Sequence, residues 1–279
     1  MVSEGAVPST DAVVLIGAGR MGGALIKGWI AAGNFSAIRV VEPQPSEAVK
    51  ALAASEAITL DREFRGDELP AAAAIVLALK PQVLKSERAL LKTIGASGAL
   101  VLSIAAGITT AFLASQLGGG TRLVRAMPNT PGAIGRGITV LFERNGLNAG
   151  ERALADTLMA ALGETLWLED EELMDAVTAV SGSGPAYVFL MAEALAEAGR
   201  AEGLDASTAE KLGRATVAGA GALLLADERS AAELRRDVTS PGGTTEAALK
   251  VLMAQDGLAA LMRRAVAAAT ARSKILGKG

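Results

Sequence analysis

The stretch AVVLIGAGRMGGALIKGWIAAG, from Ala12 to Gly33, decides the fold of this chain. It opens with five apolar residues, Ala12 to Ile16, which have the character of a short buried strand. The next six residues, Gly17 to Gly22, match the pattern G-x-G-x-x-G, and helical spacing of the apolar residues follows. Strand, glycine turn and helix in this order predict the first unit of a dinucleotide-binding sheet.

Each glycine of the turn has a separate expected role. Gly17 permits a tight turn, Gly19 lets the backbone approach a pyrophosphate, and Gly22 lets the helix lie close to the strand. Free amides at the helix start, together with the helix dipole, would then hold the phosphates. Because a similar turn can be purely structural, the flanking strand and helix are what favour dinucleotide binding.

Length and charge narrow the class of protein. The chain has 279 residues, which is enough for a sizeable core and about two domains. Its net charge is −3 and its basic residues form no block, so nucleic acid and anionic membrane are poor candidate partners. No apolar run reaches the roughly 20 residues needed to span a bilayer, and the first residues do not resemble a signal peptide. We therefore expect a cytoplasmic protein.

Two absences limit the chemistry. The chain contains no cysteine and no histidine, which excludes thiol nucleophiles, disulfides, histidine bases and zinc sites built on either residue. We expect no metal site. Any reaction must therefore depend on a cofactor, lysine, carboxylates, hydroxyls or backbone groups. A hydride carrier suits such a chain, because the cofactor supplies the reactive atom and the protein positions it.

A carboxylate follows the second expected strand, 38–41, at Glu42. An acid about 20 residues beyond the glycine turn commonly hydrogen-bonds the adenosine ribose and disfavours a 2′-phosphate. Glu42 therefore favours NADH locally, with an exposed charge at a strand end as the alternative. Arg39 and Ser46 are nearby in sequence but less obviously in position, so both NAD and NADP remain candidate cofactors.

Alternation of strands and helices continues to about residue 168. The expected strands are 73–79, 99–104, 122–127, 138–142 and 165–168, and the expected helices are 46–54, 82–94, 109–117 and 148–162. Regular alternation with buried strands predicts an α/β fold with a mainly parallel, doubly wound sheet. Ligands of such a sheet bind at the carboxyl ends of its strands. The loops after Ile16, Leu79, Ile104 and Met127 should therefore converge on one crevice.

From about Glu171 strand signals vanish, which places a sheet domain at 1–168 and a helical domain at 169–279. The expected helices are 171–180, 185–201, 206–226, 231–237, 243–254 and 258–276. Ala215 to Leu225 contains no charged residue, and a helix that is apolar all round must be buried all round. We therefore expect this half to pair with a second chain. The alternative is burial against the sheet domain.

Two stretches of the helical half carry small and hydroxyl residues. Ser181 to Tyr187 reads SGSGPAY, and Pro185 suits the first turn of a helix. Ser240 to Glu246 reads SPGGTTE, another helix start, in which Ser240 could cap and Pro241 could take the first position. Exposed amides at such a start can bind a carboxylate without arginine. A plain helix connection and a plain capped helix are the alternatives.

Taken in order, these motifs resemble the Δ1-pyrroline-5-carboxylate reductase family, which catalyses the last step of proline biosynthesis. The resemblance runs from about Ala12 to Leu276. It rests on the glycine turn, LKP at 79–81, SIAAG at 103–107, RAMPNTP at 125–131, DAVT at 175–178, SGSGPAY at 181–187 and SPGGTT at 240–245. Each motif is weak alone, but the ordered set is highly specific.

The resemblance implies a Rossmann-like domain followed by an all-α dimerisation domain, with dimers that commonly assemble into decamers. It implies reduction of the cyclic imine of pyrroline-5-carboxylate to L-proline with NAD(P)H. The implied cofactor residues are Ile16, Gly17, Ala18, Gly19, Arg20, Met21, Glu42, Leu79, Lys80, Pro81, Ile104, Ala105, Ala106 and, less securely, Asp237. The implied substrate residues are Gly242, Gly243, Thr244, Thr245 and, less securely, Glu171. The hydroxyl of Thr245 would lie near the ring nitrogen, which makes it the candidate catalytic residue.

Chemistry agrees with this assignment, because hydride attack on a protonated imine needs no strong acid. Two rivals stay open. A β-hydroxyacid dehydrogenase, or a related imine reductase, shares the architecture, but the dehydrogenase uses a lysine on the helix that here begins at Pro185. That helix carries Glu193, Glu197 and Arg200 and no lysine. A nucleotide sensor without catalysis is the second rival. Many family members also prefer NADPH and carry a small polar or basic residue where this chain has Glu42.

Overall fold

A computed structural model describes residues 12–63 and 72–278 of the chain. Its first part is built on a sheet whose described strands follow the order β3-β2-β1-β4-β5-β6-β7-β8. The strands are β1 Ala12–Ile16, β2 Ala37–Val41, β3 Thr59–Asp61, β4 Ala72–Leu77, β5 Leu100–Ser103, β6 Leu123–Met127, β7 Gly137–Arg144 and β8 Gly163–Leu168. Sequence patterning missed β3, because three residues are too few to show an alternation.

Most strand pairs are parallel, as the sequence predicts. β1 lies between β2 and β4, and β5 and β6 follow in parallel register, with Leu77 opposite Ser103 and Ser103 opposite Arg125. The exception is β6 with β7, which run antiparallel. The carboxyl ends of β1, β4, β5 and β6 therefore meet at one edge of the sheet, and so do the four loops that were expected to converge.

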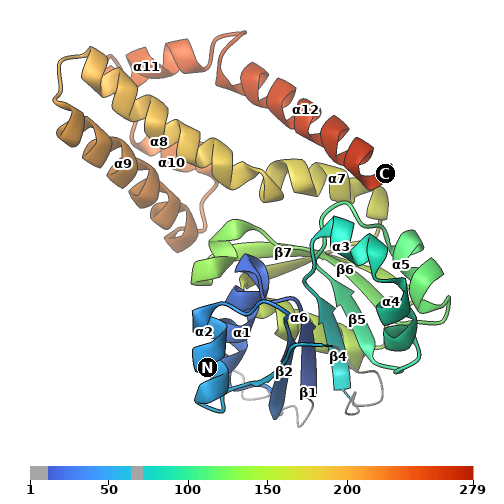
Figure 1. The fold of residues 1–279 in the computed structure, drawn as a ribbon. Coiled ribbons are helices and arrows are strands. Elements are labelled where there is room, and N and C mark those ends of the chain that lie inside the picture. Colours follow the sequence, from blue (N-terminus) through green and yellow to red (C-terminus); the bar gives the residue numbers. More distant parts are fainter. Residues whose placement is uncertain (1–11, 64–71, 279) are drawn as a thin grey trace. The chain divides into compact units, whose positions relative to one another are not determined.

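Helices cover both faces of this sheet (Figure 1). One face carries α1 Arg20–Ala32, α2 Glu47–Ala54 and α6 Ala149–Ala160, which pack on Leu15, Val40 and Leu102. The other carries α3 Pro81–Ser86, α4 Arg88–Gly95 and α5 Thr110–Leu117, which pack on Val14, Ile75 and Val101. A short 3-10 helix, η2 Thr130–Ile134, follows β6. The predicted doubly wound fold is confirmed.

The single helix predicted at 82–94 is wrong, because the chain forms α3 and α4 with a break at Glu87, where ψ is 50°. The Val83 carbonyl accepts both the Glu87 amide at 3.2 Å and the Ser86 hydroxyl at 2.8 Å where α3 ends. Leu84 in α3 and Leu91 in α4 are both fully buried. No proline or glycine marks this break in the sequence, so apolar spacing alone suggested one helix.

The rest of the chain is helical. It comprises η3 Glu171–Leu173, α7 Met174–Val177, the π-helix η4 Thr178–Gly182, α8 Gly184–Ala201, α9 Ala206–Ala226, α10 Ala231–Asp237, α11 Thr244–Leu252 and α12 Leu258–Lys278. The continuous helix predicted at 171–180 is wrong, since three short helical pieces of different winding occupy 171–182. Asp170 caps the first piece, and the hydroxyl of Thr178 bonds the Met174 carbonyl at 2.8 Å.

The chain divides into two compact units. The first extends to Gly182 and also includes the chain from Ala271 onward, whereas the second comprises Ser183–Thr270. Ser273 near the end of α12 donates to Asp175 at 2.5 Å, which ties that end to the first unit. The sequence placed the boundary after 168 because strand signals end there. As a division by function, 1–168 against 169–279 remains a prediction.

In the second unit, α8 and α9 pack closely through glycine. A Cβ on Gly213 would lie 2.7 Å from the Ala192 carbonyl oxygen, so only glycine permits this approach. The unit nevertheless leaves many large apolar side chains exposed, including Phe189, Leu190, Leu223, Leu224 and Leu225, each more than half exposed. Among the described residues no helix is long and apolar enough to cross a membrane.

Candidate functional site

In the glycine turn between β1 and α1, two glycines are required by packing and the third leaves space for a ligand. Gly17 has φ +95°, and a Cβ there would lie 2.7 Å from the Ala78 carbonyl oxygen. A Cβ on Gly22 would lie 2.3 Å from the Gly17 carbonyl oxygen. Around Gly19, by contrast, a Cβ would meet no described atom within 4 Å, and its φ of −67° suits any residue. Folding therefore requires glycine at 17 and 22, whereas glycine at 19 leaves open space for a ligand.

The first turn of α1 offers amides to that space. Gly19 is the N-cap residue, and no side chain caps the helix. The amide of Gly23 is the first to bond back into the helix, to the Gly19 carbonyl at 2.8 Å. Amides before it have no intrahelical acceptor, so they can bind an anion at the positive end of the helix dipole.

Glu42 lies next to this turn. Its Oε2 accepts the amide of Ala18 at 2.7 Å, and its Oε1 accepts the amide of Gln44 at 3.0 Å. The predicted acid after β2 is thus connected directly to the glycine turn. The carboxylate borders a hollow of about 530 Å³ between α1 and α2. Other residues that line it include Gly19, Arg20, Lys27, Gln44 and Ser46.

The loops after β4 and β5 reach the same edge. The amide of Ala78 donates to Ile16 at 2.8 Å and that of Ile104 to Leu77 at 3.0 Å, so the strand ends are joined in order. Leu79, Pro81 and Ile104 are partly exposed there, and Lys80 and Ala106 are exposed. Ile16 and Ala105 are 3% and 4% exposed and pack in the core. Ile16 and Ala105 can therefore contact a cofactor only through backbone atoms or through the small part of their side chains that is exposed.

Glu171 has polar partners within the first unit. One oxygen accepts the Thr110 amide at 2.8 Å and a guanidinium nitrogen of Arg125 at 3.0 Å. The other accepts the Thr110 hydroxyl at 2.5 Å. Thr110 opens α5 and is fully buried, and Arg125 on β6 is 5% exposed. Both carboxylate oxygens are thus used to hold the start of α5 and the middle of β6.

Sequence reasoning missed Thr110, Arg125 and Asn129 as residues that build this edge. Asn129 accepts the Ile138 amide at 3.0 Å and donates to the Ser181 hydroxyl at 3.3 Å, so it connects β7 with η4. The one available signal was an arginine within the otherwise apolar strand LVRAM, since a buried cation requires a partner. Its partner lies 46 residues further along the chain, at a distance that sequence spacing does not predict.

In the second unit, α11 begins at Thr244 with Gly243 as N-cap and no side-chain cap. The expectation that Ser240 caps this helix is wrong. The Ser240 carbonyl instead accepts the Gly243 amide at 3.0 Å, in a turn that Gly242 completes with φ +73°. Glu246 then accepts the Gly242 amide at 2.9 Å. The first amides of α11 are left without an intrahelical acceptor, as in α1.

Three predicted site residues, Thr244, Thr245 and Asp237, lie in the second unit. Thr245 is partly exposed beside the exposed Thr244. Asp237 ends α10 and pairs with Arg229, which also bonds Asp227 at 2.7 Å. The hydrogen bond from Arg229 lowers the pKa of the Asp227 carboxyl to about 2. Asp237 thus has a local partner within its own unit.

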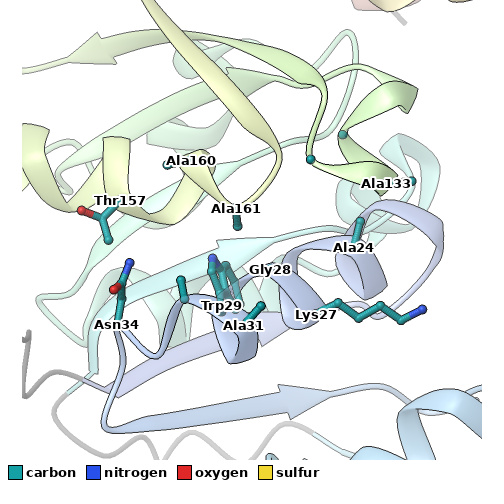
Figure 2. A pocket seen from close by; sticks show the side chains of 13 residues that line it. Ala24, Lys27, Gly28, Trp29, Ala31, Asn34, Ala133, Thr157, Ala160 and Ala161 are labelled. Atoms are coloured by element: carbon teal, nitrogen blue, oxygen red, sulfur yellow. The ribbon is translucent and has the colours of Figure 1, made fainter.

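A separate hollow of about 490 Å³ lies between α1, η2 and α6. Figure 2 shows alanines around it, among them Ala161 after α6, together with the larger side chains of Lys27 and Trp29 on α1. A Cβ on Gly28 would lie 2.6 Å from the Ala161 carbonyl oxygen, and Trp29 donates to the Leu158 carbonyl at 2.8 Å. These contacts pack α1 on the end of α6 beside the hollow, and none of the predicted site residues lines it.

Two family models match this chain, one in its helical part and one in its sheet part. A family model described as pyrroline-5-carboxylate reductase dimerisation matches residues 171–276. A second, described as NADP oxidoreductase coenzyme F420-dependent, matches residues 12–107. The first match supports the predicted pairing of the helical part with a second chain.

Whole-chain relatives agree with these matches. The pyrroline-5-carboxylate reductase of Pseudomonas aeruginosa is 42% identical, over 95% of this chain and 96% of the relative. The solved structure of a pyrroline-5-carboxylate reductase from Coxiella burnetii has a TM-score of 0.88 at 38% identity, over 97% of this chain and all of the other. The Plasmodium falciparum enzyme, solved with NADP bound, has a TM-score of 0.77 at 26% identity, over 96% and 98%.

The identity to the Pseudomonas relative extends over nearly the full length of both chains, and the fold and the ordered motifs agree with it. The resemblance inferred from sequence motifs is confirmed. The chain belongs to the pyrroline-5-carboxylate reductase family.

Proposed function

We propose that this chain is an NAD(P)-dependent oxidoreductase that reduces 1-pyrroline-5-carboxylate to L-proline, the last step of proline biosynthesis. The observation that carries the proposal is the pair of helix starts without a side-chain cap at Gly19 and Gly243, each in a turn with one further glycine, Gly17 or Gly242. Both suit anions, one a pyrophosphate and the other a small carboxylate. We assign the first to the cofactor, which the match of residues 12–107 to an NADP oxidoreductase model supports, and the second to the substrate.

The residues of the first unit fit a nicotinamide dinucleotide. The open space at Gly19 and the amides of Arg20 and Met21 suit the pyrophosphate, and Glu42 suits the adenosine ribose. The backbone of Ile16, Gly17 and Ala18 forms the floor of the turn. Leu79, Lys80, Pro81, Ile104, Ala105 and Ala106 would border the rest of the cofactor at the neighbouring strand ends. Asp237 stays a weaker candidate, because Arg229 already pairs with it.

The substrate residues come from the start of α11. Amides of Thr244 and Thr245 would hold the substrate carboxylate, with Gly242 and Gly243 shaping the turn beside it. The Thr245 hydroxyl would accept a hydrogen bond from the protonated ring nitrogen and so orient the ring. Glu171 would act on the substrate side by positioning, because both of its oxygens are bound to Thr110 and Arg125.

The reaction needs little acid–base chemistry from the protein. When bound, the reduced nicotinamide supplies a hydride. The protonated C=N unit of the ring gains that hydride at carbon, its π electrons pass to nitrogen, and a neutral amine results. The chain contributes by holding the carboxylate, orienting the ring and excluding water. Hydroxyl and amide groups suffice for these tasks, in agreement with a chain that has no histidine or cysteine.

For the assembly, we propose that two chains form a homodimer through their helical parts, and that five such dimers assemble into a decamer. Exposed apolar residues on α8 and α9 support the dimer. We place the protein in the cytoplasm, with a small-molecule substrate and neither nucleic acid nor membrane as partner. A net charge of −3, with no block of basic residues in the sequence, argues against nucleic acid and anionic membrane as partners.

A direct assay tests the function. Purified protein is mixed with pyrroline-5-carboxylate and with NADH or NADPH, and nicotinamide oxidation and proline formation are followed together. Stoichiometric proline is the expected result. Oxidation of a 3-hydroxy acid without turnover of pyrroline-5-carboxylate would support the dehydrogenase rival, and cofactor binding without any turnover would support the sensor rival.

A further inference from the structure

We infer that the hollow between α1 and α2, where the adenosine ribose of the cofactor would lie, selects NADH over NADPH. The selecting group is the Glu42 carboxylate, which two backbone amides hold in place. The inference rests on the proposed dinucleotide site. It concerns only groups of the first unit, whose contacts are described above.

The carboxylate of Glu42 is fixed before any ligand arrives. One oxygen accepts the Ala18 amide at 2.7 Å and the other the Gln44 amide at 3.0 Å. A glutamate at the end of a surface strand ordinarily samples several rotamers, and its ordering reduces affinity. Here the two amides supply that ordering, and each oxygen still has a lone pair for one more donor.

The remaining lone pairs suit a ribose diol. Two neighbouring hydroxyls can donate to the two oxygens of one carboxylate, and Ala18 fixes that carboxylate against the glycine turn. A 2′-phosphate offers acceptors and negative charge instead. It would lie against an anion that cannot swing away without losing both amide bonds, so NADPH should bind more weakly.

Several nearby cations already have acidic partners. Arg39 on β2 pairs with Asp61 on β3 at 2.5 Å, and Lys50 on α2 pairs with Glu47 at 2.6 Å. Glu47 also adds negative charge to the first turn of α2, which weakens that helix start as a phosphate site. Because these cations are paired, little positive charge is left to bind a 2′-phosphate between the end of β2 and the start of α2.

Three other cations must be weighed. Arg20 and Lys27 line the hollow beside α1, where they would attract the pyrophosphate that both cofactors share. Arg62 follows β3 and donates to the Pro43 carbonyl at 3.1 Å, next to Glu42 in sequence. Since a carbonyl does not neutralise a guanidinium, Arg62 is the competing feature that could favour NADPH. The experiment therefore includes it.

The test measures dissociation constants of NADH and NADPH by nicotinamide fluorescence, without substrate. We expect wild type to bind NADH about tenfold or more tightly than NADPH, the scale of one unfavourable charge contact. Glu42→Gln keeps the side-chain size and removes the charge, so the preference should fall to near unity through tighter NADPH binding. Lys27→Gln should weaken both cofactors by a similar factor. Arg62→Gln should leave the wild-type preference in place.

Equal or tighter NADPH binding by wild type would overturn the inference, as would an unchanged ratio in a folded Glu42→Gln variant. If Arg62→Gln or Lys27→Gln changes the ratio of the NADPH and NADH dissociation constants and Glu42→Gln does not, another residue determines specificity and the inference is wrong. If Glu42→Gln fails to fold, the wild-type ratio decides. Selective NADH binding without reduction of pyrroline-5-carboxylate would overturn the proposed function and leave this inference standing.

Discussion

Glu171 and Thr110 are joined twice, because the Thr110 amide donates to one carboxylate oxygen at 2.8 Å and its hydroxyl to the other at 2.5 Å. The same glutamate pairs with Arg125, whose side chain is 6% exposed. A residue just after the last strand therefore connects the start of α5 with the middle of β6.

Replacing Glu171 with alanine should mainly cost stability. The change leaves Arg125 buried without its anion and Thr110 without its acceptor, so the free energy of unfolding should fall by about 3 kcal/mol. Urea denaturation measures it. Glu172→Ala is the matched control, because that side chain is exposed and should change stability by less than about 0.5 kcal/mol. A raised KM with unchanged stability in Glu171→Ala would instead indicate direct substrate contact.

The glycine turn allows two neighbouring substitutions to be separated. Gly22→Ala places a Cβ 2.3 Å from the Gly17 carbonyl oxygen and should destabilise the fold by roughly 1–3 kcal/mol. Gly19→Ala meets no described atom within 4 Å, so it should fold normally. It should nevertheless bind NADH and NADPH about tenfold or more weakly, because a methyl group would stand where the pyrophosphate approaches. Thermal unfolding and fluorescence titration distinguish the two, and wild-type affinity in Gly19→Ala would contradict the assignment of Gly19.

Much of the first unit was predictable, because its signals are local. The strand, glycine turn and helix at Ala12–Ala32 and the spacing to Glu42 lie within one βαβ unit, and each short signal has a direct structural meaning. Ser46, Thr109 and Asn148 cap α2, α5 and α6 where the sequence suggested that helices begin. Order along the chain then placed the loops at one edge.

What the sequence did not predict depends on contacts between distant residues. Arg125 and Glu171 are 46 positions apart, and nothing in their local patterns connects them. The break at Glu87, where ψ is 50°, has no proline or glycine to mark it in the sequence. For Glu42, the position was expected but the bond to the Ala18 amide was not. Pairs of residues that are far apart in the sequence can be identified only once the fold is known.

Exposed leucines on α9 predict the dimer contact. Leu223, Leu224 and Leu225 are each at least half exposed in the single chain and end the uncharged stretch that begins at Ala215. Leu224→Glu places a charge within that surface and should convert dimers to smaller species, because burying an unpaired carboxylate is unfavourable. Light scattering coupled to size-exclusion chromatography measures the mass. Leu166→Glu on β8 is equally exposed and should leave the mass unchanged; an unaltered mass in Leu224→Glu would exclude this part of α9 from the interface.

Thr245 should be the residue whose loss affects the chemistry most. If its hydroxyl orients the ring nitrogen, Thr245→Ala should lower kcat/KM roughly 10- to 1000-fold, which corresponds to about 1.4–4 kcal/mol for one positioned hydrogen bond. Cofactor affinity and unfolding temperature should stay near wild type, since the side chain is partly exposed and caps no helix. Thr245→Ser restores the hydroxyl and should recover most activity. Thr244→Ala keeps its backbone amide and should have a smaller effect, so equal losses at both positions, or full activity in Thr245→Ala, would remove Thr245 from the reaction.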